Sequence, residues 1–262
     1  MKLDLFQVDA FTDKIFGGNP ACVVPLKEWL PDNILLQIAK ENAVAETAYF
    51  VDHGEHIHLR WFTPEIEMDL CGHATLATAH VLIKHLNRNS EVLKFETLSG
   101  VLTVRYNDGM YTLNFPSRMP QPAELPDIIR QAINIQPSGV LKARDYVLIY
   151  PRQEDVLNIR INRQIFDQIN LAPGGVIVTA PGNDCDFVSR FFTAQSSILE
   201  DPVTGSAHCS LIPYWSSVMR KNIFLARQLS ERIGVLHCEN LGDRVSISGQ
   251  ARTYSEGVCW ID

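Results

Sequence analysis

The chain lacks the features of a membrane-spanning, secreted or nucleic-acid-binding protein. None of its uninterrupted apolar runs reaches the roughly eighteen residues that a membrane-spanning helix needs. Its first residues alternate apolar and polar side chains and include Asp4 and Asp9, unlike the apolar core of a signal peptide. Positive charge is scarce, because 23 Lys and Arg face 30 Asp and Glu, for a formal net charge of −7. We therefore expect a cytoplasmic protein with neither a nucleic-acid nor a membrane partner, although the net charge does not exclude an anionic small substrate.

Several common catalytic and cofactor motifs are missing as well. The six cysteines are scattered and include no CxxC pair, which in a chain of 262 residues favours reduced, mostly buried thiols. There is no G-x-S-x-G elbow of a serine hydrolase, and "GGNPA" is neither a P-loop nor a dinucleotide fingerprint. His53, His56 and His58 lie close together, but no nearby Cys or acid completes a ligand pattern. From these patterns we expect neither a structural metal nor a nucleotide cofactor.

The pattern of the chain predicts two lobes of mixed α+β structure. Alternating segments predict strands early in the chain, residues 74–86 have helical spacing, and Asn107-Asp108-Gly109 is a strong hairpin turn signal. Four prolines then fall between residues 116 and 126, which favours a boundary there. We place the N-terminal lobe at 1–115, completed by the last strand at about 252–262, and the C-terminal lobe at 116–251.

A weak internal repeat supports the two-lobe interpretation. "RWFT" begins at Arg60 and "RFFT" begins at Arg190, and each is followed by an acidic loop and a helix start rich in small residues. The helix starts read "CGHAT" and "TGSAH". A duplicated lobe would explain both similarities.

The two helix starts are the first candidates for binding. Unpaired backbone N–H groups and the positive end of a helix dipole attract a carboxylate or an enolate-like charge, and Gly72 and Gly205 would let it approach closely. Both glycines could instead serve tight turns only.

Two side chains near the first helix start are candidates for proton transfer. His73 lies where the dipole disfavours an imidazolium, so we expect a neutral ring that donates or accepts a proton near pH 7. Glu46 lies between Ala45 and an apolar β-rich run, where a partly desolvated carboxylate suits proton shuttling. His73 could also be a structural histidine, and Glu46 an edge-strand glutamate in water. Cys71 at the same helix start is a candidate base or nucleophile.

Four segments together resemble one known family. "GNPACVV" near residue 18, "AETAYFV" at 45, "DLCGHATLATAHVL" at 69 and "EDPVTGSAH" at 200 have the order and spacing of the PhzF family of phenazine-biosynthesis-like proteins. The resemblance covers nearly the whole chain. It implies the diaminopimelate epimerase-like fold, in which two pseudo-symmetric lobes each wrap a mixed sheet or barrel around a central helix, with the site between them. It also implies a cofactor-independent isomerase that is usually a homodimer.

The resemblance assigns roles to particular residues. It implies that Glu46 is the acid/base carboxylate that takes a proton from one carbon of a small carboxylate-bearing substrate and returns it to another. His73 and Asp201 would hold the substrate and relay protons. The implied substrate-binding residues at the two helix starts are Gly72, Ala74, Thr204, Gly205 and Ser206.

Two departures from related proteins keep other functions open. The related epimerases use two opposed cysteines; Cys71 stands at the first position, but the second loop has Asp201 and Pro202 in place of a thiol. Ala45 replaces the usual Ser before the acid. The alternatives are an amino-acid epimerase or racemase that uses Cys71 as the second base, and a non-catalytic small-molecule binding protein.

Overall fold

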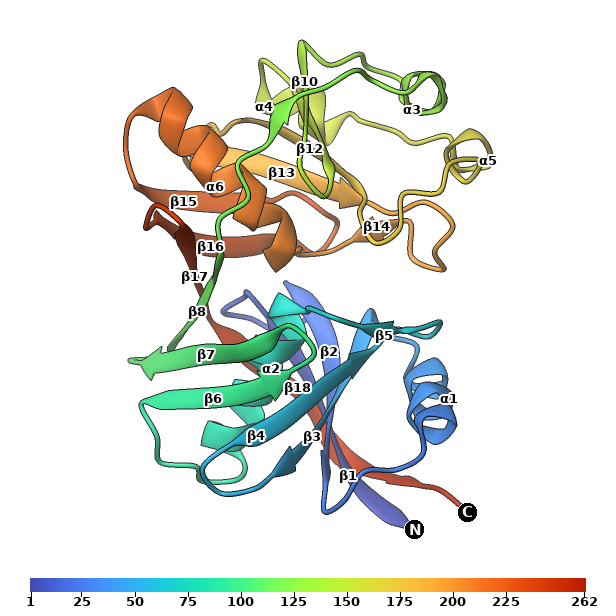
Figure 1. Ribbon diagram of the computed structural model, residues 1–262, viewed down its shortest axis with the longest axis vertical. Helices are drawn as coiled ribbons and strands as arrows, with labels where there is room; N and C mark the ends of the chain where they lie inside the picture. The colour runs from blue at the N-terminus through green and yellow to red at the C-terminus, as the bar shows by residue number, and fades with distance from the viewer. The chain divides into compact units, whose positions relative to one another are not determined.

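The computed structural model describes residues 1–262, and these divide into two compact units. Unit 1 contains Met1–Phe115 and Ser246–Asp262, and unit 2 contains Pro116–Val245. Together they form a mixed α/β fold of mostly strands with few helices, in agreement with the expected α+β class (Figure 1). No helix combines the length and the apolar character needed to cross a membrane.

The chain returns to unit 1 earlier than the expected position near residue 252. The reason is the pairing of β17 (Arg244–Gly249) with β8 (Met110–Pro116). Thr112 Oγ1 and Ser248 Oγ lie 2.8 Å apart in this pair. Strand β17 therefore begins in unit 2, and its last residues belong to unit 1.

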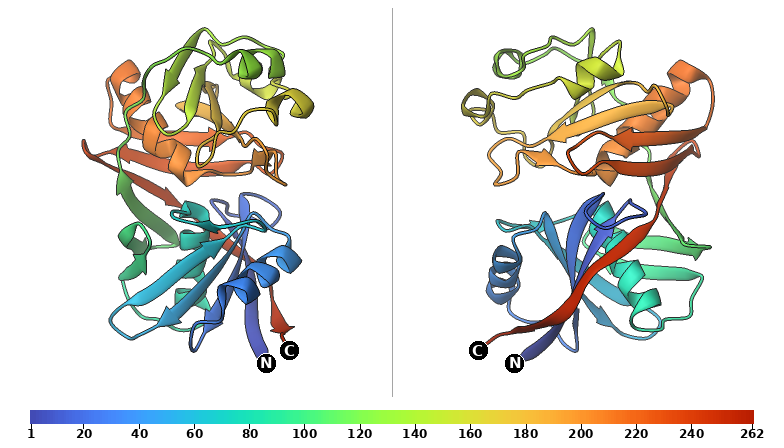
Figure 2. Two further views of the ribbon diagram at one scale, coloured as in Figure 1. Left: turned by 45° about the vertical axis from the view of Figure 1, so that its right-hand side comes forward. Right: turned by 180° about the vertical axis from the view of Figure 1, so that it is seen from behind.

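Unit 1 is built around the buried helix α2 (Gly72–Lys84), which Figure 2 shows among the strands. Every α2 residue from Gly72 to Leu82 is buried, and a helix buried on all sides needs apolar or small side chains all round. Thr75 and Thr78 satisfy their hydroxyls by donating to the carbonyls of Cys71 and Ala74 at 2.5 and 2.8 Å. The other elements of unit 1 are β1 (Lys2–Ala10), β2 (Asn19–Leu26), α1 (Asp32–Asn42), β3 (Glu46–Asp52), β4 (Ile57–Phe62), β5 (Glu67–Met68), β6 (Val92–Thr97), β7 (Gly100–Asn107) and β18 (Ala251–Trp260).

Unit 2 has its own long helix, α6 (Gly205–Met219), whose buried residues include most of its first three turns. The remaining elements are β9 (Gln121–Pro122), α3 (Asp127–Ala132), β10 (Gly139–Lys142), β11 (Tyr146–Ile149), α4 (Gln153–Leu157), α5 (Arg163–Phe166), β12 (Val176–Pro181), β13 (Phe187–Phe192), β14 (Glu200–Asp201), β15 (Ile223–Gln228) and β16 (Gly234–Asn240). A separate core packs α3, α4 and α5 against β12 through buried side chains such as Ile129, Val156 and Phe166.

The strand pairing of unit 1 recurs in unit 2. In unit 1, β2 is parallel to β3, β3 is antiparallel to β4, β4 pairs with β5 and β6, and β6 pairs with β7. In unit 2, β11 is parallel to β12, β12 is antiparallel to β13, β13 pairs with β14 and β15, and β15 pairs with β16. The long helix follows the short strand, β5 or β14, in both cases. The two arginines of the sequence repeat occupy the equivalent strands β4 and β13.

Each of these arginines clamps the short strand that precedes the helix. Arg60 donates from Nε and Nη2 to the two carboxylate oxygens of Glu67 at 2.7 and 2.6 Å. Arg190 does the same to Glu200 at 2.7 and 2.8 Å. Such bidentate pairs fix geometry as well as contributing energy. Glu200, one of the two adjacent acids before α6, is therefore a structural partner of Arg190.

Candidate active site

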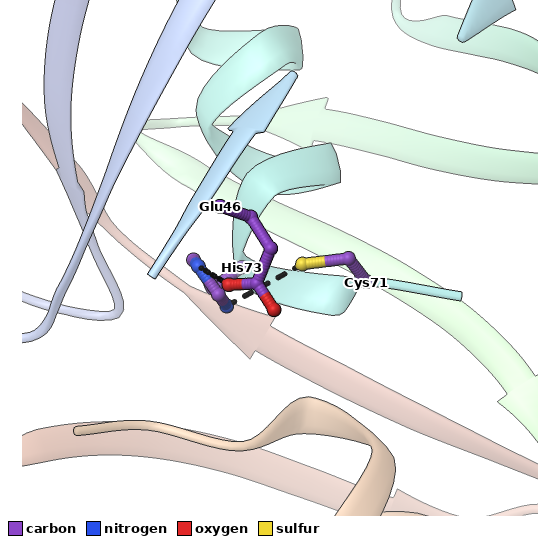
Figure 3. A group of neighbouring side chains, drawn as sticks. All are labelled: Glu46, Cys71 and His73. Carbon is purple, nitrogen blue, oxygen red and sulfur yellow. Dashed lines mark hydrogen bonds and ion pairs between the residues drawn. The ribbon is translucent and has the colours of Figure 1, made fainter. Parts of the chain in front are cut away.

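Glu46, Cys71 and His73 form a compact cluster in unit 1 (Figure 3). Glu46 Oε2 lies 3.0 Å from His73 Nε2, and Cys71 Sγ lies 3.6 Å from His73 Nδ1. The side chains of His73 and Glu46 are 4% and 15% exposed. Nε2 and Oε2 are at hydrogen-bonding distance, but neither atom has a partner with good hydrogen-bond angles. The structure thus brings together three of the candidate residues, and the facing atoms Nε2 and Oε2 are buried without a well-aligned hydrogen bond.

Local structure explains how Glu46 reaches this position. Helix α1 ends at Ala43, whose left-handed backbone (φ 52°) turns the chain toward β3. Asn42 Nδ2 donates to Thr47 Oγ1 at 3.0 Å, which ties the end of the helix to the start of the strand. Glu46 is the first residue of β3 and lies opposite Ala21 of the parallel strand β2. The carboxylate is therefore held by a short connection that is anchored on both sides.

The start of α2 provides the other two side chains. Cys71 precedes the helix in an extended conformation and makes no side-chain cap hydrogen bond. Gly72 and His73 are the first two helical residues, and Ala74 follows; all three are buried. A helix start that lacks a capping side chain leaves backbone N–H groups for another partner, which suits an anion.

Burial and charge set the protonation of this cluster. Burial, reinforced by the Glu46 carboxylate, raises the pKa of Cys71 to about 11, so the group is a thiol at neutral pH. Burial by itself lowers the pKa of His73, but Cys71 and Glu46 outweigh it and raise that pKa well above its ordinary value. The direction is opposite to the one expected from the helix dipole. A full negative charge 3.0 Å from the ring outweighs the roughly half charge of a helix end.

Asn19 is a further member of the cluster that was not among the predicted site residues, although it lies inside the family motif "GNPACVV". Its side chain is buried, and Nδ2 lies 3.1 Å from His73 Nδ1. The preceding Gly18 has φ +59°, and a Cβ there would lie 2.0 Å from the carbonyl oxygen of Ala10. Only glycine fits this turn, which sends Asn19 inward at the start of β2. A polar residue flanked by "GG" and "P" was the signal that could have identified it.

The candidates at the start of α6 form a second cluster, in unit 2. Thr204 Oγ1 donates to Asp201 Oδ2 at 2.5 Å. Gln228 accepts from the Thr204 backbone N–H at 2.8 Å and donates to the Asp201 carbonyl at 2.7 Å. This network shapes the loop from Asp201 to Gly205, the first residue of α6. The joint role expected for Asp201 and His73, which belong to different units, stays a prediction.

Ser206 in the same cluster has a partner, Arg144, that local sequence patterns do not indicate. Arg144 Nη2 donates to Ser206 Oγ at 2.8 Å, and Arg144 Nε donates to the buried Asp145 Oδ1 at 3.2 Å. Asp145 Oδ1 also accepts from the Gly175 backbone N–H at 2.9 Å. Because an arginine can only donate, Ser206 Oγ accepts this bond and keeps its own hydroxyl hydrogen for another acceptor.

Two groups of residues could be considered as metal ligands. In "HGEHIH", His58 Nδ1 accepts from Trp29 Nε1 at 3.0 Å, while His56 Nδ1 lies 3.8 Å from Glu96, so these two rings have separate partners. Glu46, Cys71 and His73 offer donor atoms within 4.8 Å of one another. However, the carboxylate faces Nε2 and the thiol faces Nδ1, and one ion cannot bind both edges of a ring.

Comparisons with known proteins agree with this fold. An uncharacterized isomerase of Pseudomonas aeruginosa is 45% identical over 259 residues, which cover 98% of this chain and 99% of that protein. A crystal structure of a phenazine biosynthesis protein of the PhzF family from Enterococcus faecalis superposes with a TM-score of 0.94 at 40% identity and covers 100% of both chains. A hydroxyproline epimerase from Agrobacterium vitis shares the fold, with a TM-score of 0.64 at 11% identity over 98% of this chain and 92% of that one.

The match to a family model is nearly as long as the chain. Residues 8–257 match the model of the phenazine biosynthesis-like proteins, and relatives that are 40 to 45% identical are named isomerases. With the motifs at Glu46, at Gly72 and His73, and at Asp201 all inside the matched range, the chain belongs to the PhzC-PhzF family of phenazine biosynthesis-like proteins.

Proposed function

We propose that the protein is an isomerase that needs no cofactor and moves a proton between two carbons of a small carboxylate-bearing substrate. The contact between Glu46 Oε2 and His73 Nε2, at 3.0 Å in a nearly buried setting, is the observation that carries this proposal. A carboxylate beside an imidazole is a suitable pair for general acid/base catalysis, because each can donate or accept a proton. The isomerase names of relatives 40 to 45% identical support the same reaction class.

Glu46 takes and returns the proton in this proposal. It remains 15% exposed, whereas His73 is only 4% exposed, so the carboxylate is the member of the pair that a substrate can reach more easily. His73 holds the carboxylate in place and stabilises the charge that develops during proton transfer. A single acid/base that works on one face of the substrate gives a shift of a double bond or a tautomerisation.

An epimerase reaction would require a second base on the opposite face of the substrate. Cys71 is the candidate for that base, but its pKa, raised to about 11 by burial and by the Glu46 carboxylate, favours a thiol over the thiolate that abstracts a proton. We therefore propose a proton shift in preference to epimerisation.

The carboxylate of the substrate has a suitable partner at the start of α6. Ser206 has its hydroxyl hydrogen free to donate because Arg144 donates to its oxygen at 2.8 Å. Thr204 and Gly205 shape the adjoining loop, and the uncapped backbone N–H groups of α6 add to the attraction for an anion. Gly72 and Ala74 present only small side chains at the start of α2, which lets a substrate approach the backbone. Asp201 assists proton relay in this proposal.

Solvent-deuterium uptake tests the proposed function directly. A panel of small carboxylic and amino acids is incubated with the protein in deuterated buffer, and mass spectrometry detects substrates that gain a carbon-bound deuteron. Glu46→Gln is expected to abolish the uptake, while the exposed Glu65→Gln in the same unit serves as the matched control and retains it. Uptake that persists in Glu46→Gln would refute the assignment. A ligand that binds the wild-type protein without any exchange would favour the non-catalytic alternative.

A further inference from the structure

We propose that Asn19 is a positioning residue for His73: with the thiol of Cys71, it fixes the neutral imidazole as the tautomer that carries its proton on Nε2, facing Glu46. The inference rests on the proposed function only in giving this tautomer a catalytic use. The tautomer itself follows from the hydrogen-bonding groups around the ring.

The Nδ1 edge of the ring faces two donors. Asn19 Nδ2 lies 3.1 Å away, and an amide nitrogen can only donate. Cys71 Sγ lies 3.6 Å away and carries a hydrogen that it can direct to the ring nitrogen. A nitrogen that faces two donors is best matched when it keeps its lone pair and bears no hydrogen.

The Nε2 edge faces an acceptor. Glu46 Oε2 lies 3.0 Å away, and an ionised carboxylate can only accept. The ionisable groups that face His73 are Glu46 from β3 and Cys71 from the segment before α2. The hydrogen of the neutral ring therefore belongs on Nε2, since the opposite tautomer would set a lone pair against the carboxylate and an N–H against the Asn19 amide hydrogens.

Asn19 is held firmly enough for this task. It is fully buried and pairs with Ala10 in the antiparallel register of β1 and β2. Its neighbour Gly18 is the residue that lets the turn pass within reach of the Ala10 carbonyl. The side chain therefore approaches the start of α2 from a fixed strand and not from a mobile loop.

When the ring is neutral, the Nε2–H tautomer presents an N–H and not a lone pair to Glu46. The ring then directs an N–H toward one carboxylate oxygen 3.0 Å away, which favours the present direction of the carboxylate. The other oxygen of the carboxylate is then the one that can take a proton from the substrate. Reversal of the tautomer would remove this support without removing either catalytic side chain.

The ¹⁵N shifts of the histidine rings test the proposal without any need for a substrate. The full-length protein is labelled on its eight histidines, and His73→Gln identifies the signals of His73. In the pH range where the ring is neutral, we expect the wild-type signal to show a protonated Nε2 and a bare Nδ1. Asn19→Asp, which replaces the donor by an acceptor, is expected to put a proton on Nδ1. Asn89→Asp, the same change at an exposed residue of the same unit, is expected to leave the ring in the wild-type state.

The catalytic consequence is read separately. Asn19→Asp should lower kcat on the order of a hundredfold, with a smaller effect on KM, because a general acid/base pair contributes about that much. A wild-type ring that carries its neutral proton on Nδ1 would overturn the proposal, and this result requires no variant to fold. Ring signals that are the same in Asn19→Asp and wild type would overturn it too. If the ring has the expected tautomer but no deuterium uptake is found, the proposed function fails and the tautomer assignment stands.

Discussion

Glu46→Gln tests the chemistry of the site with little change in shape. Glutamine has the size of glutamate, so the connection from Asn42 to Thr47 and the pairing of β3 with β2 should remain. The amide cannot take up or return a proton, and it removes the negative charge 3.0 Å from His73 Nε2. Activity and the pKa of His73 should therefore change together while the fold is kept.

The expected loss of activity can be estimated from the role assigned to the carboxylate. Proton transfer by a positioned side chain contributes about 10²- to 10⁴-fold, which corresponds to roughly 3 to 5 kcal/mol of transition-state stabilisation. Glu46 both takes and returns the proton in the proposed reaction. We therefore expect kcat to fall by a factor near the upper end, about 10⁴.

The same substitution changes how stability depends on pH. The folded-state pKa of His73 is raised above its unfolded value near 6.5, so its ion pair stabilises the fold fully below about pH 6.5 and loses this effect as pH rises through the folded value. Glu46→Gln removes the pair. The wild type should therefore exceed the variant in free energy of unfolding most clearly in mildly acidic buffer, above the range where carboxylates protonate, and least at alkaline pH.

Two measurements test the expected effects of Glu46→Gln on activity and on stability. Deuterium uptake gives kcat for the wild type and Glu46→Gln, and urea unfolding at mildly acidic and alkaline pH gives the two stability differences. A variant that keeps activity within tenfold of the wild type would refute the proton-transfer role. A stability difference that grows with rising pH would refute the ion pair.

Four further outcomes are expected. Cys71→Ser should keep deuterium uptake within about tenfold of wild type, because the buried thiol is no base at neutral pH; a loss as large as that of Glu46→Gln would favour the two-base epimerase. Burial and nearby positive groups lower the pKa of His80 to about 4, so the free energy of unfolding should fall as pH drops from 6.5 to 4. Urea titration at both pH values should show a fall that is on the order of 3 kcal/mol larger in the wild type than in His80→Gln. Arg190→Met should cost about 3 kcal/mol in urea unfolding and Arg60→Met about 2, because Arg190 Nη1 also donates to three backbone carbonyls, whereas Arg60 Nη1 donates only to the exposed Asp32; equal costs would contradict this accounting. Asp201→Asn should lower kcat about a hundredfold with an unchanged melting temperature, and full activity would remove Asp201 from the mechanism.

Local patterns in the sequence were sufficient for the parts of the fold that depend on neighbouring residues. The alternation in residues 2–11 and 56–63 predicts strands there, and most of each segment forms a strand, β1 and β4. Small residues after Cys71 predict the start of a helix, and α2 begins at Gly72. The cluster of Glu46, Cys71 and His73 was accessible through the family motifs, since each residue lies inside one of them.

The rest depends on contacts between distant segments. Asn19 reaches His73 because β2 lies beside α2, and the two residues are 54 positions apart. Arg144 reaches Ser206 across 62 positions. The pKa of His73 was expected in the wrong direction because helix position alone was considered, and the carboxylate at 3.0 Å was unknown. Periodicity carries no information about such pairs.

The duplicated arginine–glutamate clamp separates the task of holding the backbone from the task of doing chemistry. Glu67 and Glu200 fix the backbone several residues before α2 and α6 through their arginine partners. The first side chains of each helix therefore contribute less to holding the fold. One helix could then acquire an imidazole and a thiol while its counterpart acquired hydroxyls. A duplicated scaffold of this kind can change its reaction by substitutions at a few helix-opening positions and leave its architecture intact.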